Sequence, residues 1–240
     1  MRFSSKYILL LGLCGALLPS FSAGQKVDKK EEKVVVAASL PAVVQKTEHA
    51  GVAYDASWAK QVYMITDSVA LGAKGAMKKG FKGWKVTVDG HESMGVPEAT
   101  RRVKENKTLP PIVIIAVGYN SSWENNRKNI DRYTKQFDTQ VEAMLKAVTT
   151  RGAKKVVWVL LRDPMAAPSG KKSHKYYEKK GFYFGYVNER LIALHEKHPE
   201  LSIADWNSAS TDPSYTADGI HLSAAGAAVM VEVIKVSVGL

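Results

Sequence analysis

From residue 61 onward, short apolar runs alternate with longer segments of helical periodicity, and this alternation constrains the fold more than any other feature. The expected strands are Gln61–Thr66, Trp84–Asp89, Ile112–Val117, Lys155–Leu161 and Leu201–Asp205. The expected helices are Ser68–Lys79, Pro97–Lys104, Asn129–Thr150, Phe184–Lys197 and Ser223–Val238. Strands that alternate with helices pair in parallel, with each helix crossing over one face of the sheet. The sequence therefore predicts an α/β fold with a five-stranded parallel sheet.

Two segments indicate that helices cover both faces of this sheet. Ile112–Val117 is apolar without alternation, which is typical of a strand buried on both faces. Asn129–Thr150 has apolar residues at helical spacing, so one side of that helix packs on the sheet. We therefore predict a three-layer α/β/α sandwich of the flavodoxin-like type. In such folds ligands bind at the carboxyl ends of the strands, so polar residues that directly follow a strand are site candidates.

The N-terminus has the pattern of a secretory signal peptide. Arg2 and Lys6 supply a positive start, and residues 7–18 form an apolar run shorter than the roughly 20 residues of a membrane span. We predict a cleaved signal peptide over residues 1–23 and hence a location outside the cytoplasm, in the cell envelope. An uncleaved anchor and lipidation at Cys14 are the alternatives.

Residues 24–50 are predicted to form a tether, and residues 51–240 a single domain with an early helix around Ala53–Lys60. Cys14 is the only cysteine, so the exported chain has no disulfide and depends on its core for stability.

The formal net charge is +11, of which Arg2 and Lys6 contribute two. No nucleic-acid-binding motif accompanies this charge, so we do not expect a nucleic-acid partner. For an exported protein, peripheral contact with anionic envelope polymers or lipid surfaces is the expected consequence. The histidines have no metal-ligand spacing, and we expect neither a metal nor a diffusible cofactor.

Three residue types needed for nucleophilic catalysis follow predicted strands. Ser68 lies where the first strand gives way to a helix, and Asp218 and His221 lie three residues apart ahead of the last helix. A serine hydroxyl becomes nucleophilic when an adjacent base takes its proton and a third group orients that base. Alone, such a serine is most often a helix cap and such a loop is most often exposed. Their joint occurrence indicates an active site.

The segments that carry these residues resemble blocks I, III and V of the SGNH, or GDSL, hydrolase superfamily. They are Thr66–Val69, Gly118–Asn120 and Asp218–Leu222. Further matches resemble the secreted SGNH domains attached to membrane acyltransferases, including peptidoglycan O-acetyltransferases: Val156–Pro164 with its Arg-x-Pro, Val187–Asn188, Ile203–Trp206 and Asp218–Gly226. The resemblance covers about residues 61–238 and implies the SGNH hydrolase fold.

The resemblance implies a role for each residue of the predicted triad. Ser68 would be the nucleophile that forms an acyl-enzyme, and His221 would be the general base for attack and then the acid for the leaving alcohol. Asp218 would orient the imidazole and stabilise its positive form.

The resemblance also implies an oxyanion hole. Its donors would be the backbone N–H of Ser68, the side-chain amide of Asn120 and a group from block II, for which Ser93 aligns best and Gly90 or Gly95 is the alternative. One position departs from the family pattern, because Thr66 stands where a glycine usually precedes Asp-Ser. This departure puts in doubt the approach of substrate and the backbone geometry of the serine.

Three further features are candidate substrate contacts. His91 lies near block II, and Trp123 follows block III, where it either stacks on a sugar or fills a crevice. The segment 166–180 mixes lysines with tyrosines, and either lines a groove for an anionic glycan, contacts anionic lipid or is a solvated loop.

The implied function is that of a secreted serine esterase or O-acyltransferase acting on O-acyl, especially O-acetyl, esters of cell-envelope carbohydrate. A transferase would need a separate membrane acyltransferase as donor system, since this chain contains none. The alternatives are a non-catalytic envelope-binding module on the same scaffold and a lipase or thioesterase acting on long acyl chains.

Overall fold

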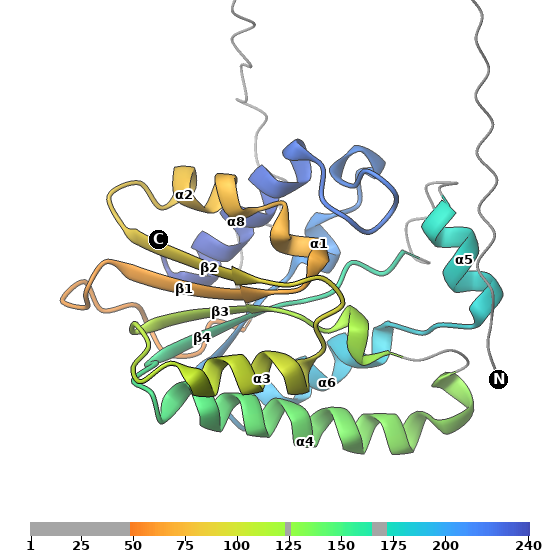
Figure 1. The fold of residues 1–240 in the computed structure, drawn as a ribbon, viewed down its shortest axis with the longest axis horizontal. Helices are drawn as coiled ribbons and strands as arrows, with labels where there is room; N and C mark the ends of the chain where they lie inside the picture. The colour runs from red at the N-terminus through yellow and green to blue at the C-terminus, as the bar shows by residue number, and fades with distance from the viewer. Residues whose placement is uncertain (1–48, 123–125, 165–171) are drawn as a thin grey trace, which may run out of the picture. The chain divides into compact units, whose positions relative to one another are not determined.

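The computed structural model describes residues 49–122, 126–164 and 172–240 (Figure 1). One parallel sheet has the strand order β2–β1–β3–β4–β5. Its strands are β1 (Gln61–Thr66), β2 (Lys85–Gly90), β3 (Ile112–Ala116), β4 (Lys155–Val159) and β5 (Leu201–Ala204). The predicted fold class is confirmed, and the predicted strands lie within two residues of these bounds. The predicted signal peptide and residues 24–48 of the predicted tether lie outside the described residues.

Helices cover both faces of the sheet (Figure 1). The α-helices are α1 (Ser68–Leu71), α2 (Lys74–Gly80), α3 (Val96–Glu105), α4 (Ile130–Thr149), α5 (Lys172–Lys180), α6 (Gly185–His195), α7 (Trp206–Ala209) and α8 (Ala224–Val238). Short 3₁₀ turns are η2 (Tyr119–Ser121), η3 (Asn126–Asn129) and η4 (Pro213–Tyr215). Helices α3, α4 and α6 pack on one face, and α2 and α8 on the other. Within the described ranges, no helix is long and apolar enough to cross a bilayer.

Strand β3 shows why the sheet needs both layers. All five of its residues are buried, and successive side chains point to opposite faces. Val113 and Ile115 join the core under α3, α4 and α6, whereas Ile112 and Ile114 join the core under α2 and α8. The central strand is therefore apolar throughout, as predicted for a strand covered on both sides.

Three local predictions were wrong. The helix predicted over Ser68–Lys79 is interrupted, because the N–H of Ala73 donates to the carbonyl of Ala70 and tightens the turn between α1 and α2. Ala53–Lys60 contains no helix; instead, the carboxylate of Asp55 accepts the N–H of Ser57 in a turn. Helix α5 occupies part of the segment that was interpreted as a loop.

The chain ahead of β1 is attached to the sheet by a buried lysine. Lys155, at the start of β4, is 2% exposed, and its Nζ donates to the carbonyls of Ala50 and Val52. The carbonyl of His49 accepts from the N–H of Ile203 in β5, 3.0 Å away. Burial lowers the pKa of Lys155 to about 8.

Candidate active site

The turn after β1 presents Ser68 at the carboxyl edge of the sheet. Asp67 is the N-cap of α1, and its Oδ1 accepts the N–H of Val69 at 3.0 Å. Ser68 is the first residue of that helix, and its side chain is partly exposed at the end of the strand.

The structure brings the three predicted triad residues together. Ser68 Oγ lies 3.1 Å from His221 Nε2, and His221 Nδ1 lies 2.7 Å from Asp218 Oδ2. The carboxylate accepts the Nδ1 proton, so Nε2 has a free lone pair directed at the serine hydroxyl. This arrangement can remove the hydroxyl proton and stabilise the imidazolium that results.

Asp218 and His221 are held in a tight hairpin. Thr216 and Leu222 form an antiparallel bridge, and Asp218 Oδ1 accepts the N–H groups of Ile220 at 3.0 Å and His221 at 2.8 Å. Burial alone would raise the pKa of Asp218, but the His221 ring and these N–H donors together hold it below its usual value. The carboxylate is therefore ionised wherever the imidazole is used as a base.

A buried arginine ties this hairpin to the end of β4. Arg162 is 1% exposed; its Nη1 donates to the carbonyl of Gly219 at 2.6 Å and to Thr216 Oγ1 at 3.2 Å, and its Nε donates to the carbonyl of Ser210 at 2.8 Å. Gly219 has φ +106°, a conformation that favours glycine and turns its carbonyl in the hairpin. Sequence reasoning recorded Arg162 only as part of a family motif and missed this role. The available signal was a charged residue directly after a buried strand.

Asn120 lies next to the serine turn, in η2 after β3. Its Nδ2 lies 3.4 Å from Asp67 Oδ2 and 3.4 Å from the carbonyl of Met94. Both distances are long for N–H···O bonds, and Asn120 is exposed. The amide is therefore placed beside Ser68 without being fully occupied by protein acceptors.

The Asp67 carboxylate lies between the serine turn and Asn120, with Oδ1 accepting the N–H of Val69 and Oδ2 3.4 Å from the Asn120 amide nitrogen. It is fully buried, and that burial raises its pKa to about 7, although the N–H groups of Val69 and Gly118, the His221 charge and the Asn120 amide all favour the ionised form. A buried carboxyl with this pKa changes charge close to neutrality, in the residue that directly precedes Ser68.

The block II segment lies between β2 and α3. Ser93 is exposed and adopts φ +58°, the left-handed conformation that is uncommon for residues other than glycine. A Cβ at Gly95 would lie 3.4 Å from the carbonyl oxygen of Asn120. Gly90 is different, because a Cβ there would lie 2.5 Å from Leu71 and 3.0 Å from Thr66 Cγ2. Gly95 thus lies beside the Asn120 turn, whereas a side chain at Gly90 would meet β1 and α1.

The predicted substrate contacts have different outcomes. His91 is exposed directly after β2, and its N–H donates to the carbonyl of Thr66 at 3.1 Å. Trp123 lies outside the described residues. Thr66 is fully buried, and its Oγ1 lies within hydrogen-bond distance of the carbonyls of Asp67 and Ala116, at 3.0 and 3.2 Å. The threonine side chain therefore contacts the sheet interior.

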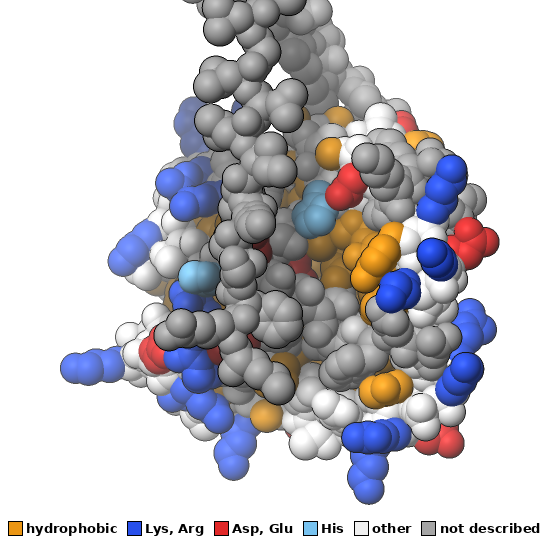
Figure 2. All heavy atoms as spheres, turned by 45° about the vertical axis from the view of Figure 1, so that its right-hand side comes forward, with side chains coloured by type: hydrophobic (Ala, Val, Ile, Leu, Met, Phe, Trp, Pro, Cys, Tyr) orange, Lys and Arg blue, Asp and Glu red, His pale blue; other side chains and the backbone are white. Residues whose placement is uncertain are grey.

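The triad lies on an open surface. The side chains of His221 and Asp218 are 48% and 46% exposed. Beneath the serine turn, a cavity of about 10 Å³ is lined by Asp67, Tyr119 and Trp206 among others, which is about the room for one water molecule. Figure 2 turns toward the viewer the side of the molecule on which α5 lies and shows histidine, hydrophobic and basic side chains at its surface.

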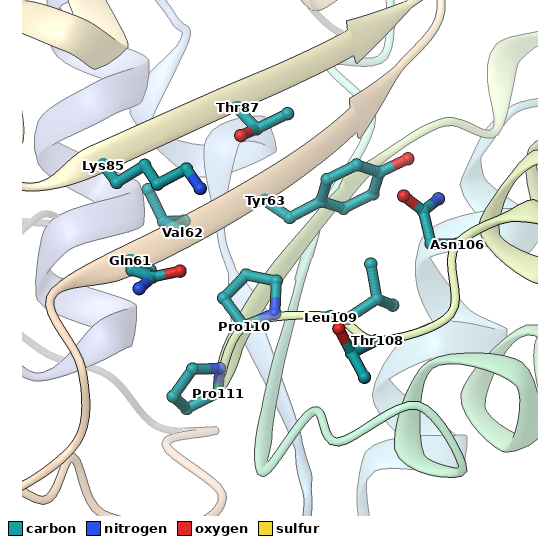
Figure 3. Close-up of a pocket in the computed structure, with 10 residues that line it drawn as sticks. All are labelled: Gln61, Val62, Tyr63, Lys85, Thr87, Asn106, Thr108, Leu109, Pro110 and Pro111. Carbon is teal, nitrogen blue, oxygen red and sulfur yellow. The ribbon is translucent and has the colours of Figure 1, made fainter.

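A larger cleft lies at the opposite end of the strands. It has a volume of about 380 Å³, and Tyr63, Lys85, Thr87 and Asn106 are among its lining residues (Figure 3). Its wall includes Gln61 and Lys85, the first residues of β1 and β2, so it is separate from the triad. Across the described ranges, no group of three or more His, Cys, Asp or Glu side chains is placed to hold a metal ion.

The sequence model of the GDSL-like lipase/acylhydrolase family matches residues 47–234. The chain belongs to this family. Its members are esterases and acyltransferases, and this protein is an enzyme of that class. No curated protein matches the chain.

Several solved structures are similar to this one. The catalytic domain of peptidoglycan O-acetyltransferase A from Streptococcus pneumoniae is 21% identical, with 76% of this chain and 94% of that chain covered and a TM-score of 0.53. A GDSL-like lipase from Bacteroides thetaiotaomicron is 16% identical, with 75% and 88% covered and a TM-score of 0.57. A G-D-S-L lipolytic protein from Veillonella parvula is 14% identical, with 73% and 97% covered and a TM-score of 0.52. These similarities show the shared fold.

Proposed function

We propose that this GDSL-family enzyme is an exported serine esterase or O-acyltransferase that acts on O-acetyl esters of cell-envelope carbohydrate. Ser68 attacks the ester carbonyl while His221 Nε2 takes its proton, and the acyl-enzyme forms as the protonated imidazole gives that proton to the leaving alcohol. Asp218 keeps the imidazole oriented through Nδ1 and stabilises its charge. Water or a sugar hydroxyl then resolves the acyl-enzyme, with His221 again acting as base.

The proposed oxyanion hole consists of the backbone N–H of Ser68, the side-chain amide of Asn120 and a donor from Ser93. The incompletely occupied Asn120 amide and the exposed Ser93 turn support this assignment, with Gly95 as the alternative block II donor. Preorganised donors of this kind are worth about 3 kcal/mol each in the transition state.

The observation that carries the proposal is the series of contacts from Ser68 through His221 to Asp218 on an open surface. Because the side chains of His221 and Asp218 are about half exposed, a bulky alcohol can approach Ser68 from the surface. The choice of acetyl over longer acyl groups rests on the resemblance to peptidoglycan O-acetyltransferase domains, and the chain-length preference of the enzyme tests it against the lipase and thioesterase alternatives.

The comparisons support the choice of carbohydrate. Structures similar to this one include a peptidoglycan O-acetyltransferase and an acetyl xylan esterase, both named for acetyl groups on glycans. The N-terminal sequence pattern supports export, with the activity in residues 51–240. For transfer, a separate membrane acyltransferase would supply the acyl group.

The test is ester hydrolysis by the purified protein, with 4-nitrophenyl acetate and longer acyl esters as substrates. We expect Ser68→Ala and His221→Ala each to lower kcat by about 10⁴-fold or more, and Ser57→Ala, at an exposed serine away from the site, to leave it unchanged. A fluorophosphonate should label wild-type Ser68 covalently.

The outcomes separate the alternatives. A preference for acetyl over longer acyl groups supports the proposal, and the reverse preference supports a lipase or thioesterase. Activity that appears only with a carbohydrate acceptor assigns the protein as a transferase. An inert wild-type protein that also fails to label at Ser68 would leave the envelope-binding module as the better description.

A further inference from the structure

Helix α5 lies beyond the carboxyl ends of the strands, the end of the sheet at which α1 begins with Ser68 (Figure 1). Among its described side chains, Lys175 and Lys179 are exposed and Tyr176 is 50% exposed. The exposed surface of α5 therefore combines two lysine ammonium groups, those of Lys175 and Lys179, with the flat ring of Tyr176 between them. Neither the triad nor the oxyanion donors use these residues.

An aromatic series connects this surface to the active site. The ring of Tyr176 lies edge-on to Tyr177 at 5.2 Å, Tyr177 lies edge-on to Phe184 at 5.0 Å, and Phe184 lies edge-on to Tyr119 at 5.4 Å. Tyr119 directly precedes Asn120 in η2. The tyrosine on the outer surface is therefore joined by packed rings to the turn that carries the amide donor.

The charges of two acidic residues in the site act on Tyr177. Burial raises the pKa of Tyr177, and the neighbouring Tyr176 and the negative charges of Asp218 and Asp67 add to that increase. The two carboxylates belong to the hairpin of the triad and to the serine turn. The negative charges of the site therefore reach Tyr177, whereas Tyr176 lies on the outer surface of α5.

We propose that α5 is a subsite for an anionic glycan chain, with the ring of Tyr176 stacked on a sugar and Lys175 and Lys179 paired with carboxylates of the same chain. The proposal rests on the proposed function, since the acetylated sugar lies at Ser68 while its neighbours in the chain extend along α5. The substrate is then a negatively charged polysaccharide, and the polysaccharide chain leaves the active site on the side where α5 lies.

The ring of Tyr176 is suited to such a contact. It packs against Tyr177 and against Phe182, with ring centroids 6.4 Å apart in the second pair, so its orientation is held before the ligand arrives. An aromatic face carries negative partial charge and attracts the C–H groups of a sugar ring. Because the ring has few rotatable bonds and is already packed, little side-chain entropy is lost on binding.

The composition of the surface favours a glycan over a lipid bilayer. In the described part of the chain, the large hydrophobic residues that are exposed are Val52, Tyr176 and Leu240. Helices that insert into the surface of a bilayer use exposed leucine, isoleucine, phenylalanine or tryptophan side chains. The described side chains of α5 include no exposed residue of these types. Its lysines supply attraction for anions, and its tyrosine supplies a stacking face.

The experiment compares two substrates in the full-length protein. One is 4-nitrophenyl acetate, which is too small to reach α5, and the other is an O-acetylated polysaccharide that carries carboxylates. The variants are Tyr176→Ala and the double substitution Lys175→Glu with Lys179→Glu. The matched control is Lys78→Glu with Lys79→Glu on α2, which changes the net charge equally at two exposed lysines elsewhere.

We expect each α5 variant to lower kcat/KM for the acidic polysaccharide by about tenfold through KM, and to leave hydrolysis of 4-nitrophenyl acetate unchanged. Added salt should reduce the difference between wild type and the lysine variant. On neutral acetylated xylan, Tyr176→Ala should still lower kcat/KM, whereas the lysine variant should match wild type. Unchanged kcat/KM on the acidic polysaccharide, or an equal loss from the α2 control, would overturn the proposal.

Binding separates this proposal from the proposed function. The affinity of the deacetylated acidic polysaccharide for Ser68→Ala protein requires no turnover, and Tyr176→Ala in that background should weaken it by a similar factor. If wild type hydrolyses neither ester but this binding difference persists, the function fails and the subsite stands. If α5 variants instead lose binding only to vesicles of anionic phospholipid, the glycan subsite is wrong.

Discussion

Replacement of Arg162 by methionine removes three hydrogen bonds and keeps an unbranched apolar side chain of about the length of the arginine's aliphatic stem. Two of the acceptors are the backbone carbonyls of Gly219 and Ser210, and the third is Thr216 Oγ1. Because Arg162 is 1% exposed, water cannot replace the lost donors without opening the structure. The hairpin that carries Asp218 and His221 then loses its attachment to the end of β4.

The magnitude follows from the number of buried acceptors left without a donor. Each orphaned buried carbonyl costs about 1–3 kcal/mol, so two of them give a loss of about 4 kcal/mol in the free energy of unfolding. One guanidinium nitrogen, Nη2, is already buried with no hydrogen-bond partner among the described residues, and its removal offsets part of this loss. A displacement of the hairpin by about 1 Å would lower kcat by about 10²-fold.

The assay is steady-state hydrolysis of 4-nitrophenyl acetate beside thermal unfolding of the same variants. We expect Arg162→Met to lower kcat with KM little changed, and to slow fluorophosphonate labelling of Ser68 by a similar factor. Arg162→Lys should recover part of the loss, because one ammonium can reach a single carbonyl.

The control separates loss of stability from loss of positioning. Arg190→Met breaks the partly buried pair between Arg190 and Asp138, with N···O distances of 2.9 and 2.8 Å, away from the hairpin. It should lower Tm without lowering kcat at a temperature where the variant is folded. If Arg162→Met is destabilised yet keeps the wild-type kcat, the arginine does not position the triad.

Three further predictions concern buried or partly occupied polar groups. Asn120→Ala should lower kcat by about 10²-fold with KM little changed, as measured on 4-nitrophenyl acetate, because one oxyanion donor is lost. The pKa of Asp67 is about 7 in the folded protein and 3.8 in the unfolded chain, so the unfolded chain binds fewer protons between these values. The free energy of unfolding of the wild type should therefore fall by up to about 1.4 kcal/mol per pH unit between pH 5 and 7. Urea unfolding of Asp67→Asn should lack this slope. The pKa of Lys155 is about 8 in the folded protein and 10.5 in the unfolded chain, so here the unfolded chain binds more protons between these values. The free energy of unfolding of the wild type, relative to that of Lys155→Met, should therefore rise between pH 8 and 10. An equal pH dependence of the two proteins would contradict the burial of this lysine.

The fold was predictable because every strand carries its own burial pattern. Ile112–Ala116 is apolar at each position, and the structure buries each of those side chains between two helical layers. Helix α5 was not predictable in this way, because its hydrophobic residues are tyrosines among lysines and it lacks a continuous apolar face. Its contacts with Phe182 and Phe184 are made by the tertiary structure.

The triad was predictable because its chemistry requires particular residue types after particular strands. The structure places Ser68, His221 and Asp218 within hydrogen-bond distance of one another in series, so they remain the candidate triad. The role of Arg162 could not be predicted from the sequence, because its guanidinium donates to the backbone carbonyl of Gly219. Every residue type has such a carbonyl. Backbone acceptors leave no mark in a sequence.

Thr66 illustrates how a departure from a family pattern is absorbed by a neighbouring strand. Where the family has glycine, this chain has a β-branched residue, and its methyl group is 3.0 Å from the position that a Cβ on Gly90 would occupy. Gly90 lies directly opposite Thr66 in the register of β1 and β2. The Thr66 methyl group therefore occupies the space that a side chain at Gly90 would need. The threonine hydroxyl has acceptors in the carbonyls of Asp67 and Ala116, so its burial does not cost it a hydrogen bond. The departure at Thr66 therefore changes the packing between two strands and leaves the approach to Ser68 Oγ to residues of block II and η2.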